Sequence, residues 1–263
     1  MTFFDTHAHL NYESFRDSWK EVADRAARAG VRYINNIGTD ITTWDSAVEL
    51  AKAKPDNFIA TLGVHPTHVH EEPYANIDSV LSTLSKLMKK QGVVAVGEAG
   101  LDYKHHPDTA ELQKEYFARF IEFAREHNKT LVMHCRDAYE DFYDVLKANF
   151  KSGQKGVVHF YIGDHEMLKK FLDLGLYIGY TGVITYPKTD NYAENLRYTP
   201  ADRIVIETDS PFAAPVPYRG RPNEPAYVVE VAKRIADVKG VSLDEVARET
   251  TANALALFSL DTR

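Results

Sequence analysis

The sequence predicts an α/β protein folded as a (β/α)8 TIM barrel, and two observations lead to this expectation. Short apolar segments rich in β-branched residues alternate repeatedly with longer amphipathic segments, which is the pattern of parallel βαβ units. The chain also has 263 residues, a length that closed α/β barrels commonly occupy as one domain. We therefore expect a single TIM-barrel domain that spans residues 1–263.

The expected strands are short runs of Val, Ile, Leu and Phe. They lie at residues 2–6, 31–37, 58–64, 93–97, 130–133, 156–159, 176–180 and 203–207. An open, doubly wound sheet would show the same alternation of strands and helices. No G-x-G-x-x-G or Walker-type glycine loop follows the first strand, which weakens the nucleotide-binding version of that open fold. The closed barrel is therefore the favoured architecture.

The expected helices are amphipathic stretches between the strands, at residues 17–29, 41–53, 77–90, 109–127 and 137–150. In the fourth stretch, large apolar residues recur at three- and four-residue steps and share one face. They are Leu112, Tyr116, Phe120 and Phe123. Asp108, followed by Glu111, predicts a capping box at the start of that helix. We expect further helices at residues 225–238, 242–249 and 251–260, as the last barrel helix and its packing extension.

Composition narrows the class of protein. The net charge is −7 and the pI is near 5.9, which argues against a protein that coats long stretches of nucleic acid. An enzyme that grips a few phosphates remains compatible with this charge. No apolar run approaches 18 residues, the start lacks the features of a secretory signal, and the one cysteine, Cys135, excludes an internal disulfide. A cytoplasmic protein without membrane association is the expectation.

Histidines and carboxylates stand where the apolar strands end. His7 and His9 are two residues apart in an extended segment, so they project from the same face and can share one divalent cation. A residue that can bind metal also follows each of four later apolar strands. These residues are Glu98, His134, His159 and Asp209. The carboxyl-terminal rim of a TIM barrel is where this fold carries its chemistry. We therefore expect these side chains to converge there.

Taken singly, each of these residues has a purely structural alternative. His134 would be a buried histidine with satisfied hydrogen bonds, Glu98 would pair with Arg136, and Asp209 would cap the loop that follows it. Taken together, these alternatives are weaker, because burying so many ionisable groups is costly unless they are paired or bind metal. Four imidazoles and two carboxylates exceed the four ligands of a structural zinc and suit two cations. Magnesium, manganese, zinc, iron and nickel all accept such ligands.

Ordered motifs along nearly the whole chain resemble one family. They are residues 5–10 (Asp-Thr-His-Ala-His-Leu), 63–66 (Gly-Val-His-Pro), 97–103 (Gly-Glu-Ala-Gly-Leu-Asp-Tyr), 134–138 (His-Cys-Arg-Asp-Ala), 158–159 (Val-His), 177–182 (Tyr-Ile-Gly-Tyr-Thr-Gly), 207–211 (Glu-Thr-Asp-Ser-Pro), 217–225 (Pro-Tyr-Arg-Gly-Arg-Pro-Asn-Glu-Pro) and 251–253 (Thr-Ala-Asn). The chain resembles the TatD-type metal-dependent deoxyribonucleases, a branch of the amidohydrolase superfamily. The run between residues 207 and 225 is the most specific of these motifs.

The resemblance implies a role for each metal ligand. His7, His9 and Asp209 would bind the first metal, and His134 and His159 would bind the second. Glu98 would bridge the two metals, in the place where many amidohydrolases use a carboxylated lysine. Asp209 would also orient or deprotonate the water that the two metals activate, and so act as general base.

The same resemblance suggests residues for the substrate phosphate. They are His65, Arg136 and Arg219. Arg219 and Arg221 also fit a solvated loop with Pro and Gly neighbours, which is a structural alternative for both. One position departs from the family, which usually reads Cys-Phe-Ser/Thr-Gly after the second-metal histidine. Here Ile162 replaces the hydroxyl residue, so a hydrogen bond near the site is lost and substrate preference is open to change.

Three functional hypotheses follow. The first is a 3′–5′ exonuclease that cleaves phosphodiester bonds at the ends of single-stranded DNA, with no obligate protein partner. The bases of the DNA would stack on exposed aromatic side chains, for which the candidates are Tyr103, Tyr161, Tyr186 and Tyr218. The alternative is that these four tyrosines pack within the protein. The second is a two-metal hydrolase of carboxyl esters or amides, including aminoacyl esters of tRNA. The third is a metal-bearing interaction module without turnover, against which the complete ligand set argues.

Overall fold

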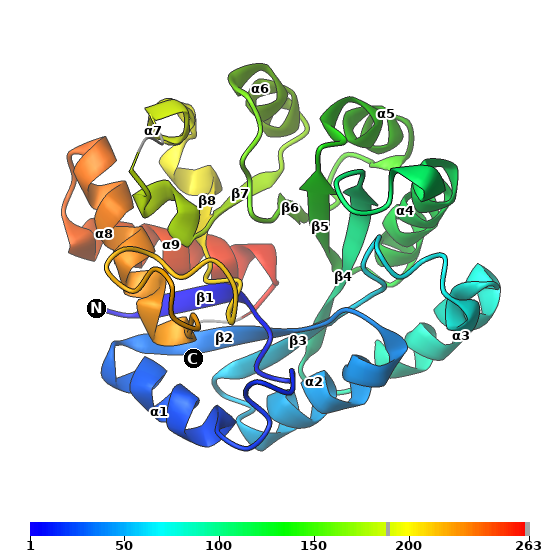
Figure 1. Ribbon diagram of the computed structural model, residues 1–263, viewed down its shortest axis with the longest axis horizontal. Helices are drawn as coiled ribbons and strands as arrows, with labels where there is room; N and C mark the ends of the chain where they lie inside the picture. Colours follow the sequence, from blue (N-terminus) through cyan, green and yellow to red (C-terminus); the bar gives the residue numbers. More distant parts are fainter. Residues whose placement is uncertain (188–189, 261–263) are drawn as a thin grey trace.

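A computed structural model describes residues 1–187 and 190–260. Within these ranges eight parallel strands follow one another around a nearly closed barrel, and helices surround it (Figure 1). The strands are β1 (Phe3–Ala8), β2 (Val31–Gly38), β3 (Phe58–Leu62), β4 (Val93–Asp102), β5 (Thr130–Arg136), β6 (Gly156–Val158), β7 (Tyr177–Tyr180) and β8 (Ile204–Ile206). Each strand pairs with the next in chain order, so the predicted (β/α)8 architecture is confirmed.

The segment that follows β8 returns to β1 and closes the ring. Ala8 and Ser210 form a parallel bridge, and the backbone N–H of Asp209 donates to the carbonyl of His7 at 2.8 Å. Deeper in the barrel, the hydroxyl of Thr208 donates to Oδ2 of Asp5 at 2.6 Å. These bonds fix the chain around Asp209 directly beside the strand that carries the first two histidines.

The helices are α1 (Trp19–Arg28), α2 (Ile41–Ala53), α3 (Ile77–Leu87), α4 (Ala110–Glu126), α5 (Tyr139–Asn149), α6 (His165–Asp173), α7 (Asp190–Tyr198), α8 (Val228–Lys239) and α9 (Leu243–Leu257). Helices α1 to α8 lie around the outside of the strands in Figure 1. Helix α9 instead packs across the amino ends of the strands. Its Asn253 side chain donates to the carbonyls of Ala201 and Ile204, and Thr251 donates to the carbonyl of Thr2. No helix among the described residues is both long and apolar enough to cross a bilayer.

Successive residues of a strand serve two different apolar clusters. On β5, Leu131 and Met133 join the large cluster between the strands and the helices, whereas Val132 joins a smaller cluster with Phe4 and Val205. The residues of α9 and its end that complete the smaller cluster are Ala254, Leu255, Leu257 and Phe258. The smaller cluster therefore fills the amino half of the barrel interior, and the carboxyl half is left for other side chains.

Several expected boundaries differ from the structure. The expected helices at 242–249 and 251–260 form one continuous helix, α9, because the two threonines at its middle, Thr250 and Thr251, are buried and bonded to backbone carbonyls. Strands β4 and β5 run on to Asp102 and Arg136, so Glu98 and His134 lie within strands rather than after them. The expected apolar face of α4 is confirmed, with Leu112 partly buried and the other three buried.

The capping box expected from Asp108 and Glu111 is wrong. Residues Pro107–Thr109 form a 3-10 turn, and Thr109 is the N-cap of α4 without a side-chain hydrogen bond. The turn is instead held by Gln113, whose Nε2 donates to Thr109 Oγ1 at 2.9 Å and to the carbonyl of His106 at 2.8 Å. A buried glutamine one turn into the helix therefore replaces the local capping interaction.

Candidate metal centre

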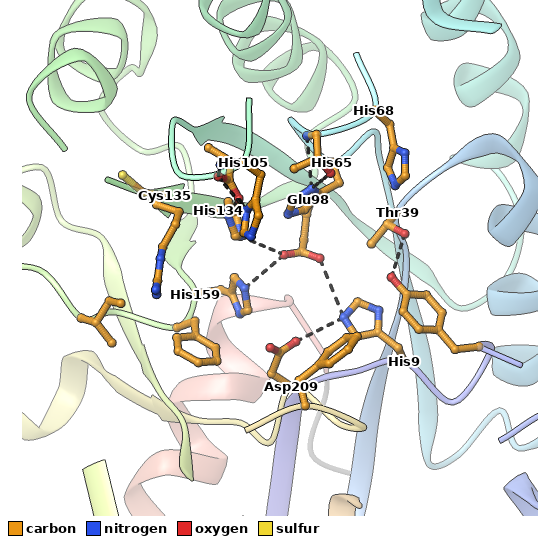
Figure 2. A pocket seen from close by; sticks show the side chains of 17 residues that line it. His9, Thr39, His65, His68, Glu98, His105, His134, Cys135, His159 and Asp209 are labelled. Atoms are coloured by element: carbon orange, nitrogen blue, oxygen red, sulfur yellow. Dashed lines mark hydrogen bonds and ion pairs between the residues drawn. The ribbon is translucent and has the colours of Figure 1, made fainter. Parts of the chain in front are cut away.

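The six predicted metal ligands meet at the carboxyl ends of the strands. Five of them line a cavity of about 450 Å³, and His7 lies fully buried beneath it. The labelled ligands in Figure 2 point toward one another from different sides of this cavity. His7 lies in β1 and His9 directly follows that strand. Glu98 lies in β4 and His134 in β5, and the remaining two ligands follow β6 and β8. The six side chains therefore converge in the structure, as the sequence predicts.

Glu98 lies between two groups of imidazoles. Its Oε1 is 3.1 Å from Nε2 of His159 and 3.6 Å from Nδ1 of His134. Its Oε2 is 3.4 Å from Nε2 of His7 and 3.9 Å from Nε2 of His9. Each oxygen of the carboxylate therefore faces a different pair of histidines.

Asp209 joins the pair on β1. Its Oδ1 is 3.2 Å from Nε2 of His9 and 3.7 Å from Nε2 of His7. Asp209 therefore does not serve merely as a cap for the following loop. Its backbone has a φ of 55°, in the left-handed region that Asp tolerates better than most residues, and this turn directs the side chain back over the barrel.

Two strands change their alternation just before their ligands. Phe4 and Ala95 belong to the inner apolar cluster, yet His7 and Glu98, each three residues later, also point into the barrel. A strand with strict two-residue alternation would send them outward. The pairing shifts by one between Asp5 and Ala8 on β1 and between Val96 and Ala99 on β4. These bulges turn the ligands toward the cavity.

Gly97 permits the bulge on β4. Its φ is +142°, and a Cβ there would collide with the carbonyl oxygen of Val132 on the neighbouring strand. Only glycine combines that backbone conformation with such a close approach. The residue before Glu98 is therefore fixed by backbone geometry rather than by chemistry.

Two further buried carboxylates orient the histidines of β5 and β6. Nε2 of His134 lies 3.2 Å from Oδ2 of Asp102, and Nδ1 of His159 lies 3.2 Å from Oε1 of Glu207. In each case the other ring nitrogen faces Glu98. A carboxylate behind a ligating imidazole fixes its tautomer and its orientation.

The electrostatics of the cluster require positive charge. Burial would raise the pKa of Glu98, but the imidazoles of His7 and His159 hold it well below its ordinary range. Burial likewise opposes the charged form of His159, yet Glu207 and Glu98 outweigh it and raise the pKa of this imidazole well above its usual value. A buried carboxylate and a buried imidazolium thus stabilise each other. Metal cations supply the same positive charge when they displace protons from imidazoles.

His7 shows that these residues fit a metal. Burial and the neighbouring imidazole of His159 lower the pKa of His7, so this environment disfavours its charged form. Neither of its ring nitrogens makes a hydrogen bond within the described residues, although the side chain is fully buried. Buried polar nitrogens without a partner are rare and call for a missing one. Groups of His, Asp and Glu ligand atoms that include His7 lie within 4.8 Å of one another, so a divalent cation is a suitable partner.

Comparison with known proteins also indicates a metal-dependent protein. A family model described as TatD related DNase matches residues 4–259. The chain belongs to this family. It is 38% identical over 264 residues to the uncharacterized metal-dependent hydrolase YcfH of Escherichia coli K12, with 99% of this chain and 97% of that protein covered. It is 35% identical over 258 residues to the uncharacterized metal-dependent hydrolase YabD of Bacillus subtilis, with 98% and 99% covered.

Among solved structures, the TatD homologue YjjV of Escherichia coli K12 superposes with a TM-score of 0.90. The two sequences are 27% identical, and 98% of each chain is covered. The protein is therefore a metal-dependent hydrolase of the TatD family, and it has candidate metal-binding clusters of His, Glu and Asp.

In this TatD-family protein the three residues expected to bind phosphate have different positions. His65 and Arg136 line the cavity, whereas Arg219 does not. Arg219 is exposed and lies over the ring of Tyr186 at 4.4 Å. Arg221 is likewise exposed on the same loop. The structure thus brings two of the three expected residues to the metal ligands and separates the third.

The structural alternatives were that Glu98 pairs with Arg136 and that His134 is a buried histidine with satisfied hydrogen bonds. Among the described residues Nε of Arg136 forms an ion pair with Oδ1 of Asp137 at 4.0 Å, and not with Glu98. His134 does have hydrogen-bond partners, but it uses one nitrogen for Asp102 and turns the other toward Glu98. Ile162, which replaces a hydroxyl residue of the family pattern, lines the cavity with an apolar surface.

The aromatic residues proposed for base stacking are not the ones at the cavity. Tyr161 is buried against Tyr139 and Phe171, so its expected exposure is wrong. Tyr218 stacks on Tyr227 at a ring distance of 3.8 Å. The aromatic residues that do line the cavity are Tyr12, Phe160 and Phe212. Their positions depend on loops, which periodicity does not describe.

Sequence reasoning also missed Asp102 and Glu207. A signal for both was present, because Asp102 is four residues after Glu98 along the same strand and Glu207 is two residues before Asp209. Even spacing places side chains on one face of a strand. Glu207 additionally accepts a 2.6 Å hydrogen bond from the backbone N–H of Phe160, which holds the turn after β6 at a φ of 49°.

Proposed function

We propose that this protein is a metal-dependent deoxyribonuclease that removes nucleotides from the 3′ end of single-stranded DNA. The observation that carries the proposal is the position of Glu98, with one oxygen toward each pair of histidines. Membership of the TatD related DNase family supports a nucleic acid substrate. Magnesium, manganese and zinc are the candidate cations, two per chain.

The proposed ligand assignment follows the distances. His7, His9 and Asp209 would hold one cation, His134 and His159 would hold the other, and Glu98 would serve as a ligand to both. When bound, a pair of divalent cations activates a water and neutralises charge on the phosphate oxygens. Asp102 and Glu207 keep the imidazoles of His134 and His159 in the tautomer that presents a lone pair to the cavity.

Asp209 is the proposed general base. Its side chain is 14% exposed and lines the cavity, whereas that of Glu98 is 3% exposed. Asp209 is therefore the carboxylate that an attacking water reaches more readily. A base in this position removes a proton from water as the phosphodiester bond breaks.

Arg136 and His65 are the proposed phosphate-binding residues. Nε of Arg136 is buried without a hydrogen-bond partner among the described residues, and a phosphate oxygen satisfies such a donor. Burial and the neighbouring His134 lower the pKa of His65 well below its usual value, so it binds as a neutral ring. Its Nδ1 lies 2.7 Å from the hydroxyl of Thr67, which leaves Nε2 for the substrate.

The test is a time course on single-stranded DNA labelled at either end. Purified protein is stripped of metal, and magnesium, manganese or zinc is added back separately. We expect a metal-dependent ladder that shortens from the 3′ end. The His7→Ala/His9→Ala variant should lose this activity, because it lacks both histidines of β1.

A matched control is His70→Ala, which removes an exposed histidine that does not line the cavity. This variant should cleave DNA at the native rate. If the native protein binds two cations and cleaves no DNA with any of the three metals, the proposal is wrong, and carboxyl esters and amides become the substrates to test.

A further inference from the structure

A second and larger cavity adjoins the metal centre. It has a volume of about 1020 Å³ and lies between the loop after β1 and helix α2. Residues on its wall include Ser14, Trp19, Thr43 and Ser46. Tyr12 and Phe212 line both this cavity and the cavity at the proposed metal ligands, which we call the catalytic cavity. The two spaces therefore meet at these two rings. We call the larger cavity the α2 groove.

Phe212 is presented to solvent on a firmly held backbone. Its side chain is 52% exposed, whereas most large apolar side chains among the described residues are buried. Its N–H donates to the carbonyl of Asp209 at 2.9 Å, and its carbonyl accepts from Nδ2 of Asn223 at 2.7 Å. Phe212 therefore has a fixed position relative to a proposed metal ligand.

Neighbouring rings support the side chain of Phe212. The ring of Tyr12 meets it edge to face at 6.3 Å, and the ring of His9 does so at 6.2 Å. Tyr12 is in turn stacked on His9 at 4.4 Å and hydrogen-bonded to Thr39 at 3.0 Å. Both contacts of Phe212 are T-shaped rather than stacked, so neither of these rings lies flat against it.

The charges of the α2 groove do not favour phosphate. Its ionisable wall residues are Glu13, Arg16 and Glu49, so carboxylates outnumber cations there. Binding of a nucleic acid backbone by counterion release needs the opposite balance. Planar bases that stack on aromatic side chains need no cations, and hydroxyl groups such as those of Thr43 and Ser46 suit their polar edges.

We propose that the α2 groove binds the single-stranded DNA that adjoins the cleaved nucleotide, and that a base stacks on Phe212. This inference rests on the proposed nuclease function and extends it to the path of the substrate. The catalytic cavity of about 450 Å³ is less than half the size of the groove, so the groove is the space that receives the rest of the chain. Phe212 is thus a specificity-determining residue for polymeric substrates.

The experiment compares two substrates that share the cleaved bond type. One is the thymidine tetranucleotide, and the other is the p-nitrophenyl ester of thymidine 5′-phosphate, which has a single base. The quantity measured is the ratio of kcat/KM for the tetranucleotide to kcat/KM for the small ester. Phe212→Ala should lower this ratio at least about fivefold, because one stacked base contributes at least that much. The loss should lie mainly in KM.

Two variants control for indirect effects. Phe212→Trp keeps a flat aromatic face and should restore the ratio to within about twofold of the native value. Val216→Ala removes an exposed apolar side chain from the same loop but from neither cavity, and should leave the ratio unchanged. The metal content of each variant reports any disturbance of Asp209. The effect of Phe212→Ala on the ratio should be the same at low and high salt, since stacking involves no counterions.

The outcomes separate the inference from the function on which it rests. If native protein cleaves the tetranucleotide but Phe212→Ala lowers both substrates equally, the groove proposal is wrong and the nuclease proposal stands. A ratio that falls only at low salt also overturns the stacking proposal. If the native protein cleaves neither substrate with any metal, both proposals fail.

Discussion

The amino end of the barrel interior is filled by apolar side chains, whereas the carboxyl end holds histidines and carboxylates around a cavity. The same strands supply both ends. On β5 the inner apolar residue is Val132, and His134 follows it by two; on β6 the corresponding pair is Val157 and His159. Because the step is two residues, each pair points the same way and differs only in depth.

The amino end of the barrel interior mainly stabilises the fold, whereas the carboxyl end carries the groups proposed for chemistry. Apolar packing at the amino end, which α9 completes, removes hydrocarbon from water and stabilises the fold. At the carboxyl end the buried charges are satisfied only by each other and, when bound, by cations, so this end contributes less to stability than an apolar core of the same size. Substitutions at the two ends should therefore give effects of different kinds.

The largest expected effect is at the carboxyl end. Asp209→Asn keeps the size and one oxygen ligand of the side chain but removes its basicity. We expect kcat for DNA cleavage to fall by about 10²- to 10⁴-fold, the range that a general base contributes. The measurement combines single-turnover kinetics with metal analysis of the same sample. Full activity in a variant that retains its metal would show that Asp209 is not the base.

A stability effect without a chemical one is expected at the amino end. Phe258→Ala removes a buried ring that packs on Phe4 at 5.8 Å, and should cost about 3–5 kcal/mol of unfolding free energy. Urea denaturation measures the loss, and the metal content of folded protein should not change. Phe212→Ala, the same substitution at an exposed ring, should change the unfolding free energy by less than about 0.5 kcal/mol. Equal losses in the two variants would contradict the division between the ends.

A smaller effect tests the carboxylates behind the histidines. Glu207→Gln removes the charge that faces Nδ1 of His159 at 3.2 Å while it keeps the shape of the side chain. We expect metal affinity to fall by about 10- to 100-fold, as is usual when such an orienting partner is lost. Competition with a chelator of known affinity measures the change. Glu194→Gln, at an exposed position on α7, is the control and should bind metal as tightly as the native chain. Native affinity in Glu207→Gln would show that the carboxylate does not orient His159.

The local pattern of residues was sufficient for much of the fold and for the six side chains that converge at the proposed metal centre. Alternation of apolar and amphipathic segments predicts the barrel, because each parallel strand needs a helix to return the chain to the same end. Strand ends converge in such a barrel, so His134, His159 and Asp209 are predictable from their positions after apolar runs. The continuous α9 was not predictable in this way, since its middle threonines are stabilised by burial against other elements.

The amino-acid sequence specifies the set of chemical groups and the strand at which each one lies. Tertiary structure alone decided how those groups meet. The bulges on β1 and β4 reverse an alternation that would otherwise send His7 and Glu98 out of the barrel, and pairing with neighbouring strands fixes where the bulges fall. It also decided that Arg219 lies outside the cavity while Phe212, from the same long loop, stands at its edge. Loop positions depend on contacts between residues far apart in sequence, and periodicity, which is a local property, contains no information about them.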